Sequence, residues 1–273
     1  MKHESFEPSG SFFMLNENTM LGQGDCLELM KHIPDGSVDL ILTDPPYGTT
    51  ACKWDSVIPF EPMWKELKRI IKPDGAIVLF GSEPFSSMLR CSNLEMFKYD
   101  LVWEKSKGSN FVHSKYQPLK THENIIVFSK GGAAQGSKTP MKYYPQMTIG
   151  VPYDKGFGHN KLNTLNGGLS KSSSIHLKNE TGNRFPRSVH YYKTAESEGS
   201  YHPTQKPVAL LEYLIKTYTN EGETVLDFTA GSMSTAIACI NTNRRGIMIE
   251  KDDHYFKVGS ERVEKALSEK GVN

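Results

Sequence analysis

The sequence predicts an α/β protein with a doubly wound, mainly parallel sheet. Short apolar runs bounded by turn residues, such as 38–43 and 76–81, are typical of buried strands. Helical patterns alternate with these runs, and this alternation indicates a parallel sheet covered by helices. The chain has 273 residues, which is enough for one sizeable domain or for one domain with an insertion.

The predicted elements follow one another along most of the chain. We expect strands at residues 19–21, 38–43, 76–81, 99–103, 123–128, 223–227 and 245–250. We expect helices at residues 26–30, 60–71, near 85–89, 208–218, 236–241 and 253–269. Residues 1–17 are polar with little periodicity, which predicts a loose arm, and residues 72–75 are expected to form a turn.

The regular pattern is lost between residues 131 and 200. This stretch is rich in Gly, Ser, Asn, Lys and Tyr and is too long for an ordinary connection, so it predicts a functional insertion or a disordered segment. Its aromatic residues favour an ordering partner over disorder. Lysine and arginine interleaved with tyrosine and phenylalanine suit contacts to phosphates and stacking on bases.

The charge distribution indicates a polyanionic partner. The whole chain carries a net charge of +1, but residues 98–193 hold 15 Lys and Arg against 5 Asp and Glu, a net charge of +10 that leaves −9 for the remainder. A basic middle within an acidic frame favours one face that binds a polyanion. A solvated, lysine-rich loop region is the alternative.

The composition is ordinary for a water-soluble globular protein. Hydrophobic residues make up 37% of the chain and charged residues 23%, and no apolar run has the length of a membrane span. The first residues lack the apolar core of a signal peptide. The cysteines Cys26, Cys52, Cys91 and Cys239 show no metal-ligand spacing, so we expect reduced thiols in a cytoplasmic protein.

The most distinctive motif follows the strand at 38–43. Pro45 and Pro46 cannot extend a central strand, so the strand ends at Asp44 and a rigid loop begins, at the edge where open α/β sheets bind ligands. The Asp44 carboxylate, the Pro45 carbonyl and the Tyr47 ring place acceptors beside a stacking surface. This set suits a planar group with an NH2, such as a nucleobase lifted out of its stack. Taken alone, the motif also fits a simple strand-ending turn.

A second region has the pattern of a nucleoside-binding half. The strand at 223–227 runs into a loop of small residues, a helix follows, and the next strand ends in Glu250. A tight loop lets backbone N–H groups approach a ligand, and an acid about 20 residues further on can bind ribose hydroxyls. No Gly-x-Gly-x-x-Gly follows a strand, which disfavours a nicotinamide dehydrogenase.

In chain order, the motifs resemble the permuted β-class arrangement of S-adenosylmethionine-dependent DNA amino-methyltransferases. They are Asp44-Pro45-Pro46-Tyr47, His202-Pro203-Thr204-Gln205-Lys206-Pro207, Asp227-Phe228 with Gly231-Ser232, and Ile249-Glu250. The resemblance covers about residues 21–266 and matches the insertion only in position and character. It implies a Rossmann-like methyltransferase fold, S-adenosylmethionine as cofactor and double-stranded DNA as partner. It also implies site-specific methylation of adenine N6 through base flipping, as in restriction–modification systems.

The resemblance assigns roles along the chain. Residues 1–130 and 201–273 are expected to form the permuted halves of the methyltransferase domain, and residues 131–200 the target-recognition insertion. The expected catalytic residues are Asp44, Pro45, Pro46 and Tyr47. The expected cofactor-binding residues are Asp25, Thr204, Lys206, Asp227, Phe228, Thr229, Gly231, Ser232 and Glu250. In this set Asp227 takes the cofactor ammonium, Lys206 its carboxylate and Glu250 its ribose, while Asp25 reaches the adenine and also caps the helix at 26–30.

One position departs from the family pattern. Family members commonly have a glycine where this sequence has Met233, and a residue with a side chain does not easily adopt a positive φ. Either the loop does not need that geometry or cofactor binding is weakened. The alternatives therefore include a catalytically weak DNA-binding homologue, besides cytosine-N4 methylation and an RNA or protein methyltransferase. The sequence leaves a homodimer open.

Overall fold

A computed structural model describes residues 12–49, 55–159, 174–199, 201–202 and 204–271. Contacts within the chain divide it into two compact units. The first unit comprises Met1–Tyr144 with Ser188–Asn273, and the second comprises Pro145–Arg187. The second unit is thus narrower than the predicted insertion at 131–200.

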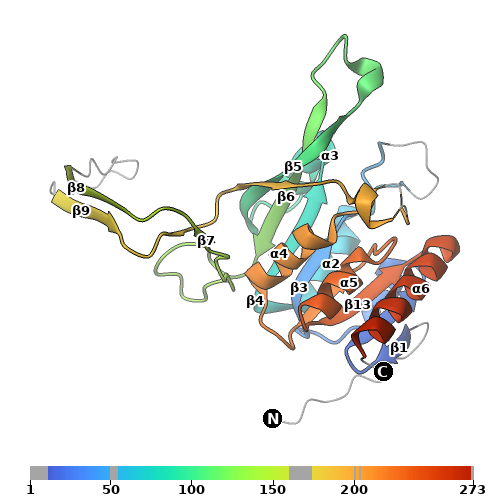
Figure 1. Cartoon of the computed structure of the whole chain (residues 1–273). Coiled ribbons are helices and arrows are strands. Elements are labelled where there is room, and N and C mark those ends of the chain that lie inside the picture. The colour runs from blue at the N-terminus through green and yellow to red at the C-terminus, as the bar shows by residue number, and fades with distance from the viewer. Residues whose placement is uncertain (1–11, 50–54, 160–173, 200, 203, 272–273) are drawn as a thin grey trace. The chain divides into compact units, whose positions relative to one another are not determined.

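The first unit is built on one large sheet (Figure 1). Within the described residues it has nine strands in the order β1-β2-β13-β12-β3-β4-β6-β5-β11. Their bounds are β1 Phe12–Asn16, β2 Thr19–Gln23, β3 Val38–Thr43, β4 Ile71–Gly81, β5 Phe97–Ser109, β6 Lys120–Ser129, β11 Val189–Tyr192, β12 Thr224–Asp227 and β13 Arg245–Glu250. The strands from β2 to β4 in this order run parallel, and β11 is parallel to β5, whereas β1 and β6 pair antiparallel with their neighbours. The prediction of a mainly parallel sheet is confirmed.

Helices cover both faces of this sheet. Their bounds are α1 Cys26–Leu29, α2 Phe60–Ile70, α3 Phe85–Cys91, α4 Val208–Tyr218, α5 Ser234–Asn241 and α6 Asp253–Lys270, with short 3-10 helices at Met30–His32, Phe111–His113 and Ala195–Glu198. On one face, α4, α5 and α6 contribute Leu211, Ile240 and Leu267 to a hydrophobic core cluster. On the other face, α2 and α3 contribute Leu67 and Leu89 to a second cluster. Among the described residues, no helix combines the length and apolar character needed to cross a membrane.

The chain reverses its direction of travel across the sheet between β3 and β12. These strands are neighbours, but β3 is joined to β4 on one side and β12 to β13 on the other. At such a switch point the loops that leave two adjacent parallel strands diverge and open a crevice. All residues of β3 are buried, so the strand that leads into the crevice is held firmly by the core. β5 and β6 extend beyond the sheet as a two-stranded ribbon (Figure 1).

Two local predictions are wrong. The end of the predicted loose arm forms β1, which pairs antiparallel with β2 and buries Phe12; residues 1–11 lie outside the described residues. The predicted turn at 72–75 lies inside β4, where the pairing with β3 shifts register between Ile71 and Ala76. An irregularity of this kind accommodates Pro73 within a strand, because proline has no N–H to give to the ladder.

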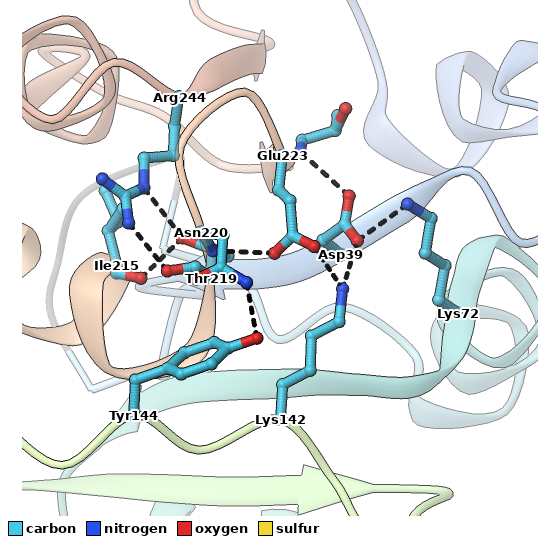
Figure 2. Close-up of polar contacts among 10 residues, drawn as sticks. Asp39, Lys72, Lys142, Tyr144, Ile215, Thr219, Asn220, Glu223 and Arg244 are labelled. Atoms are coloured by element: carbon cyan, nitrogen blue, oxygen red, sulfur yellow. Dashed lines mark hydrogen bonds and ion pairs between the residues drawn. The ribbon is translucent and has the colours of Figure 1, made fainter. Parts of the chain in front are cut away.

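A polar cluster joins the amino ends of β3 and β12 (Figure 2). The crevice lies at the carboxyl ends of the same strands. The buried Asp39 of β3 accepts contacts from Lys72 and Lys142, each 2.7 Å from its Oδ1. Lys142 also lies 2.5 Å from Oε1 of Glu223, and the backbone N–H of Thr224 donates to Oδ2 of Asp39 at 3.0 Å. One ammonium group therefore connects the beginnings of the two central strands.

The second unit consists of two small antiparallel pairs. β7 Thr148–Ile149 pairs with β10 Asn183–Arg184, and β8 Tyr153–His159 pairs with β9 Ser174–Asn179. The guanidinium of Arg184 lies 4.9 Å from the centre of the Tyr153 ring, and Nζ of Lys155 lies 5.1 Å from it. Basic groups therefore pack on an aromatic face in this unit, a combination that the composition of the stretch favours.

Candidate active site

The candidate site lies where the carboxyl ends of β3 and β12 meet. Asp44 directly follows β3, and Asp227 is the last residue of β12. Thr43 Oγ1 donates a hydrogen bond to Asp227 Oδ1 at 2.9 Å, and Thr229 Oγ1 donates to the Asp44 carbonyl at 3.1 Å. The two predicted motif regions are therefore joined directly, although they are far apart in the sequence.

A cavity of about 1070 Å³ opens at this junction. Its lining contains all the candidate residues that the sequence predicts, namely Asp25, Asp44, Pro45, Pro46, Tyr47, Thr204, Lys206, Asp227, Phe228, Thr229, Gly231, Ser232 and Glu250. Ligand pockets typically span roughly 300–1,000 Å³. The cavity therefore has room for a cofactor together with a second planar group.

Both carboxylate oxygens of Asp44 have partners. Tyr47 donates its hydroxyl to Oδ1, and the Lys206 ammonium contacts Oδ2. The Tyr47 ring stacks on Phe85, with centroids 5.0 Å apart and an interplanar angle of 25°. The loop after β3 is thus held in place by Tyr47 of the motif and by Lys206 and Phe85 from outside it.

Lys206 lies between two carboxylates. It is 7% exposed, and its Nζ lies 3.3 Å from Glu123 Oε2 and 5.2 Å from the centre of the Phe80 ring, besides contacting Asp44. Burial raises the pKa of Asp44 above its ordinary value; the Lys206 ammonium opposes this rise and Glu123 adds to it. Burial lowers the pKa of Lys206, but its two carboxylate partners outweigh burial and raise it overall. The expected contact of Lys206 with a cofactor carboxylate stays a prediction.

Asp227 is buried at the carboxyl end of β12. Its Oδ2 accepts a hydrogen bond from Thr235 Oγ1 at 2.6 Å, and its Oδ1 accepts from Thr43 and from the Thr229 N–H at 3.2 Å. Burial raises the pKa of Asp227 to about 6, against the opposing effect of these hydrogen bonds. A cationic ligand would stabilise the charged form of this buried carboxylate.

Glu250 and Asp25 fix the loops around the same cavity. Glu250 accepts hydrogen bonds from the backbone N–H groups of Gly231 and Asp252, both at 2.7 Å. Asp25 caps α1 as the sequence predicts, because its Oδ1 accepts from the Leu27 N–H at 2.9 Å. Both side chains therefore have a structural role, and their expected contacts with ribose and adenine stay predictions.

Met233 adopts a positive φ, which a residue with a side chain does not easily adopt. Its φ is 58° and its ψ is 34°, in the left-handed region, and it is fully buried at the N-cap of α5. Gly259 of α6 makes room for its side chain, because a Cβ at position 259 would lie 2.7 Å from Met233 Cγ. The loop therefore keeps the geometry that glycine usually supplies, at a cost of about 1–3 kcal/mol of backbone strain.

A family model described as DNA methylase, of the N6/N4 methyltransferase type, matches residues 38–261. The chain belongs to this DNA methylase family. The DNA adenine methyltransferase YhdJ of Escherichia coli (strain K12) is 32% identical to it over 283 residues, covering 92% of this chain and 84% of YhdJ. The type II methyltransferase M.HpaI of Haemophilus parainfluenzae is 28% identical over 258 residues, covering 88% and 72%.

Solved structures share the fold of this DNA methylase. The PvuII DNA methyltransferase, described as cytosine-N4-specific, aligns with a TM-score of 0.62 at 18% identity and covers 92% of this chain and 90% of its own. The M1.HpyAVI–SAM complex aligns with a TM-score of 0.58 at 23% identity, covering 90% and 98%. These alignments confirm the predicted methyltransferase architecture.

Three residues of the candidate site were given no role from the sequence, although Gln205 stands within the motif at 202–207. Glu123 reaches Lys206 from β6, and Asp55 accepts hydrogen bonds from the N–H groups that follow Tyr47, at 2.8 and 2.9 Å. Gln205 lines the cavity, and its buried Nε2 has no hydrogen-bond partner in the described structure. Glu123 stands at the start of a predicted strand and Asp55 soon after the predicted catalytic loop, but neither has a spacing that distinguishes it from other acidic residues.

Proposed function

We propose that this DNA methylase transfers a methyl group from S-adenosylmethionine to adenine N6 at specific sites in double-stranded DNA, with the target base turned out of the helix. The observation that carries the proposal is the presence of Asp44 and Pro45 in one cavity with the acids Asp227 and Glu250. The identity to YhdJ, which is named a DNA adenine methyltransferase, supports adenine as the target.

The cavity residues fit S-adenosylmethionine. Its amino-acid part carries an ammonium and a carboxylate, and its nucleoside part carries ribose hydroxyls. Asp227 offers a buried carboxylate to the ammonium, Glu250 offers one to the hydroxyls, and the unpartnered Nε2 of Gln205 offers a donor to the cofactor carboxylate. When bound, the cofactor supplies an electrophilic methyl group on a positively charged sulfur.

Asp44 and Pro45 act on the nucleophile in this proposal. The adenine N6 amine is a poor nucleophile because its lone pair is delocalised into the ring. Acceptance of its two N–H bonds by the Asp44 carboxylate and the Pro45 carbonyl favours a pyramidal nitrogen with an available lone pair. Burial raises the pKa of Asp44, which makes its carboxylate a better acceptor for the proton that the amine loses. Tyr47 offers its ring to the extruded base.

Cytosine-N4 methylation is the second candidate. The PvuII enzyme, whose fold this chain shares, is described as cytosine-N4-specific. Cytosine N4 presents the same type of NH2, so the acceptors on Asp44 and Pro45 suit both bases. Nucleoside mass spectrometry of DNA from cells that express the chain tests the choice. We expect N6-methyladenine in the parent and none with Asp44→Ala; N4-methylcytosine instead would favour the second candidate.

A catalytically weak homologue is a further alternative, whereas the match to a DNA methylase family disfavours an RNA or protein methyltransferase. The reason for this alternative is Met233, but Met233 adopts a left-handed backbone conformation of the kind that glycine readily adopts. We therefore expect ordinary cofactor binding, which calorimetry with S-adenosylmethionine measures directly. A protein that folds but binds no cofactor would favour the silent alternative.

Target recognition is assigned, within this proposal, to the predicted insertion at 131–200. Its compact part, Pro145–Arg187, contains the basic and aromatic side chains that suit phosphate and base contacts. A cytoplasmic location agrees with the free thiols of Cys26, Cys91 and Cys239, whereas Cys52 lies outside the described residues.

A further inference from the structure

A row of alternating charges runs from the β5–β6 ribbon to Asp44. Nζ of Lys105 lies 3.2 Å from Glu123 Oε1, and Glu123 Oε2 lies 3.3 Å from Nζ of Lys206, which contacts Asp44 Oδ2. Trp103 of β5 faces Glu123 in the strand pairing, so Glu123 sits in the hydrogen-bonded part of the ribbon. The mechanism proposed above gives Glu123 no role.

Water has little access to this row. The relative side-chain exposure is 11% for Lys105, 15% for Glu123, 8% for Lys206 and 21% for Asp44. When one partner of a buried ion pair is removed, the other charge is left uncompensated, and this strongly destabilises the site. A charged side chain in this row that moves away from one ion-pair partner therefore needs a second partner of opposite charge close by.

The proposed reaction favours movement of Lys206 away from Asp44. Asp44 accepts a hydrogen bond from the target amine, yet its Oδ1 holds the Tyr47 hydroxyl and its Oδ2 holds the Lys206 ammonium. Oδ2 can accept a second hydrogen bond, but an ammonium that stays on it lowers the pKa of Asp44 and weakens Asp44 as acceptor for the amine proton. Movement of Lys206 away from Oδ2 therefore favours the reaction. Glu123 is the other carboxylate that contacts Lys206 in the described structure.

We propose that Glu123 is a positioning residue that retains the Lys206 ammonium when the target amine displaces it from Asp44. This inference rests on the proposed role of Asp44 as the acceptor for the amine. Because Nζ already lies 3.3 Å from Glu123, the transfer needs only a small rotation of the lysine side chain and leaves no buried ammonium unpaired. Lys105 in turn balances the charge of Glu123.

Lys206 therefore has a different role from the one expected from the sequence. A lysine shared between Asp44 and Glu123 controls the access of the substrate amine to Asp44 and does not bind the cofactor carboxylate. The unpartnered Nε2 of Gln205, one residue earlier, is the donor that the cavity offers to that carboxylate. Replacement of Glu123 is therefore expected to affect methyl transfer and to leave cofactor affinity unchanged.

The charges around Asp44 affect how methyl transfer depends on pH. The groups that face Asp44 are Lys206 before α4, Glu123 on β6, Tyr47 on its own loop and Asp227 on β12. Glu123 raises the pKa of Asp44 and Lys206 lowers it. Loss of the Glu123 charge should therefore shift the acid limb of methyl transfer to lower pH, and loss of the Lys206 charge should shift it to higher pH.

The test compares Glu123→Gln with the parent on full-length protein and duplex DNA. We expect kcat to fall by at least about tenfold, because the displaced ammonium loses its partner. We expect the acid limb to move to lower pH and the dissociation constant of S-adenosylmethionine to stay within about twofold. Glu123→Asp keeps the charge and should restore part of kcat, and Lys206→Met should move the acid limb in the opposite direction.

Glu104→Gln is the matched control. Glu104 is an exposed residue of β5 that pairs with His122 across the ribbon. Its replacement removes the same charge near this row without removing a contact to Lys206. Parent-like kcat in Glu123→Gln, or a fall in kcat with an unmoved acid limb, would overturn the inference. If the parent protein produces no N6-methyladenine in duplex DNA, the proposed function itself fails. If Asp44→Asn is inactive and Glu123→Gln is like the parent, only the inference about Glu123 fails.

Discussion

Met233 occupies the space that Gly259 leaves open on α6. A Cβ at position 259 would lie 2.7 Å from Cγ and 3.0 Å from Sδ of Met233, closer than packed side chains tolerate. The methionine is fully buried and holds a left-handed backbone conformation directly before α5. The long side chain at 233 and the missing side chain at 259 are thus complementary.

Gly259→Ala should destabilise the protein by about 1–3 kcal/mol, because the added methyl overpacks the contact with Met233. Met233→Gly should also destabilise it, since loss of a buried side chain costs about 2–5 kcal/mol and outweighs the strain that glycine relieves. Together the two changes should cost less than the sum of the single effects. Urea unfolding of the four proteins measures this coupling. Strict additivity would show that the two residues do not depend on each other.

Asp227→Asn should stabilise the protein at pH 8 and weaken cofactor binding. The folded-state pKa of Asp227 is raised to about 6 from an ordinary 3.8, so the carboxylate lowers stability as pH rises between these values, on the order of 3 kcal/mol in total. A neutral asparagine removes this loss, and the Thr235 hydroxyl can turn to accept from its amide. Thermal unfolding at pH 4 and pH 8 checks the prediction. An equal pH dependence in both proteins would contradict it.

Glu250→Ala should weaken the binding of S-adenosylmethionine by more than Glu250→Gln does. Alanine removes the acceptors for the N–H groups of Gly231 and Asp252 as well as the proposed ribose contact. Glutamine keeps one side-chain oxygen and part of the loop geometry. Calorimetry with the two variants separates the contributions. Parent-like affinity in both would contradict the ribose assignment.

Neutralisation of basic residues in the predicted insertion should flatten the salt dependence of DNA binding. We choose Lys171, Lys178 and Arg187 and keep Arg184, which packs on Tyr153; Lys171 lies outside the described residues. Each lost phosphate contact should reduce the slope of log K against log salt by about 1.

The control for this change replaces exposed lysines on helices α2 and α6, namely Lys65, Lys257 and Lys265. It removes the same charge from the other unit. Fluorescence anisotropy across a salt series compares the two triple variants, and calorimetry with S-adenosylmethionine checks that both still bind the cofactor. Equal slopes in the insertion variant and the parent would show that the chosen residues do not contact phosphate.

The central strands could be predicted because each contains a run of apolar residues that are mostly buried. β3 and β13 match the predicted residues 38–43 and 245–250, since continuous apolar runs with abrupt ends leave little choice of boundary. From these strand ends, the positions of Asp44 and Glu250 at one edge of the sheet follow directly. The helix at Val208–Tyr218 was equally clear.

The supporting residues could not be predicted, because they depend on pairing that the sequence does not specify. Glu123 reaches Lys206 only because β6 inserts antiparallel between β4 and β5. The left-handed Met233 was missed for a related reason. Its conformation is stabilised by packing against Gly259, and this long-range contact outweighs the local preference of the residue.

Lys142 and Thr43 fix the two central strands β3 and β12 against sliding along each other. β3 and β12 pair through only two residue positions, but Lys142 connects their beginnings and the hydrogen bond from Thr43 to Asp227 connects their ends. Sliding of one strand along the other would break both connections. We therefore expect the two halves to move as one rigid block when ligands enter. This stiffness rests on side chains and not on the chain segments that join the strands, so the order of the two halves along the chain can change without loosening their junction.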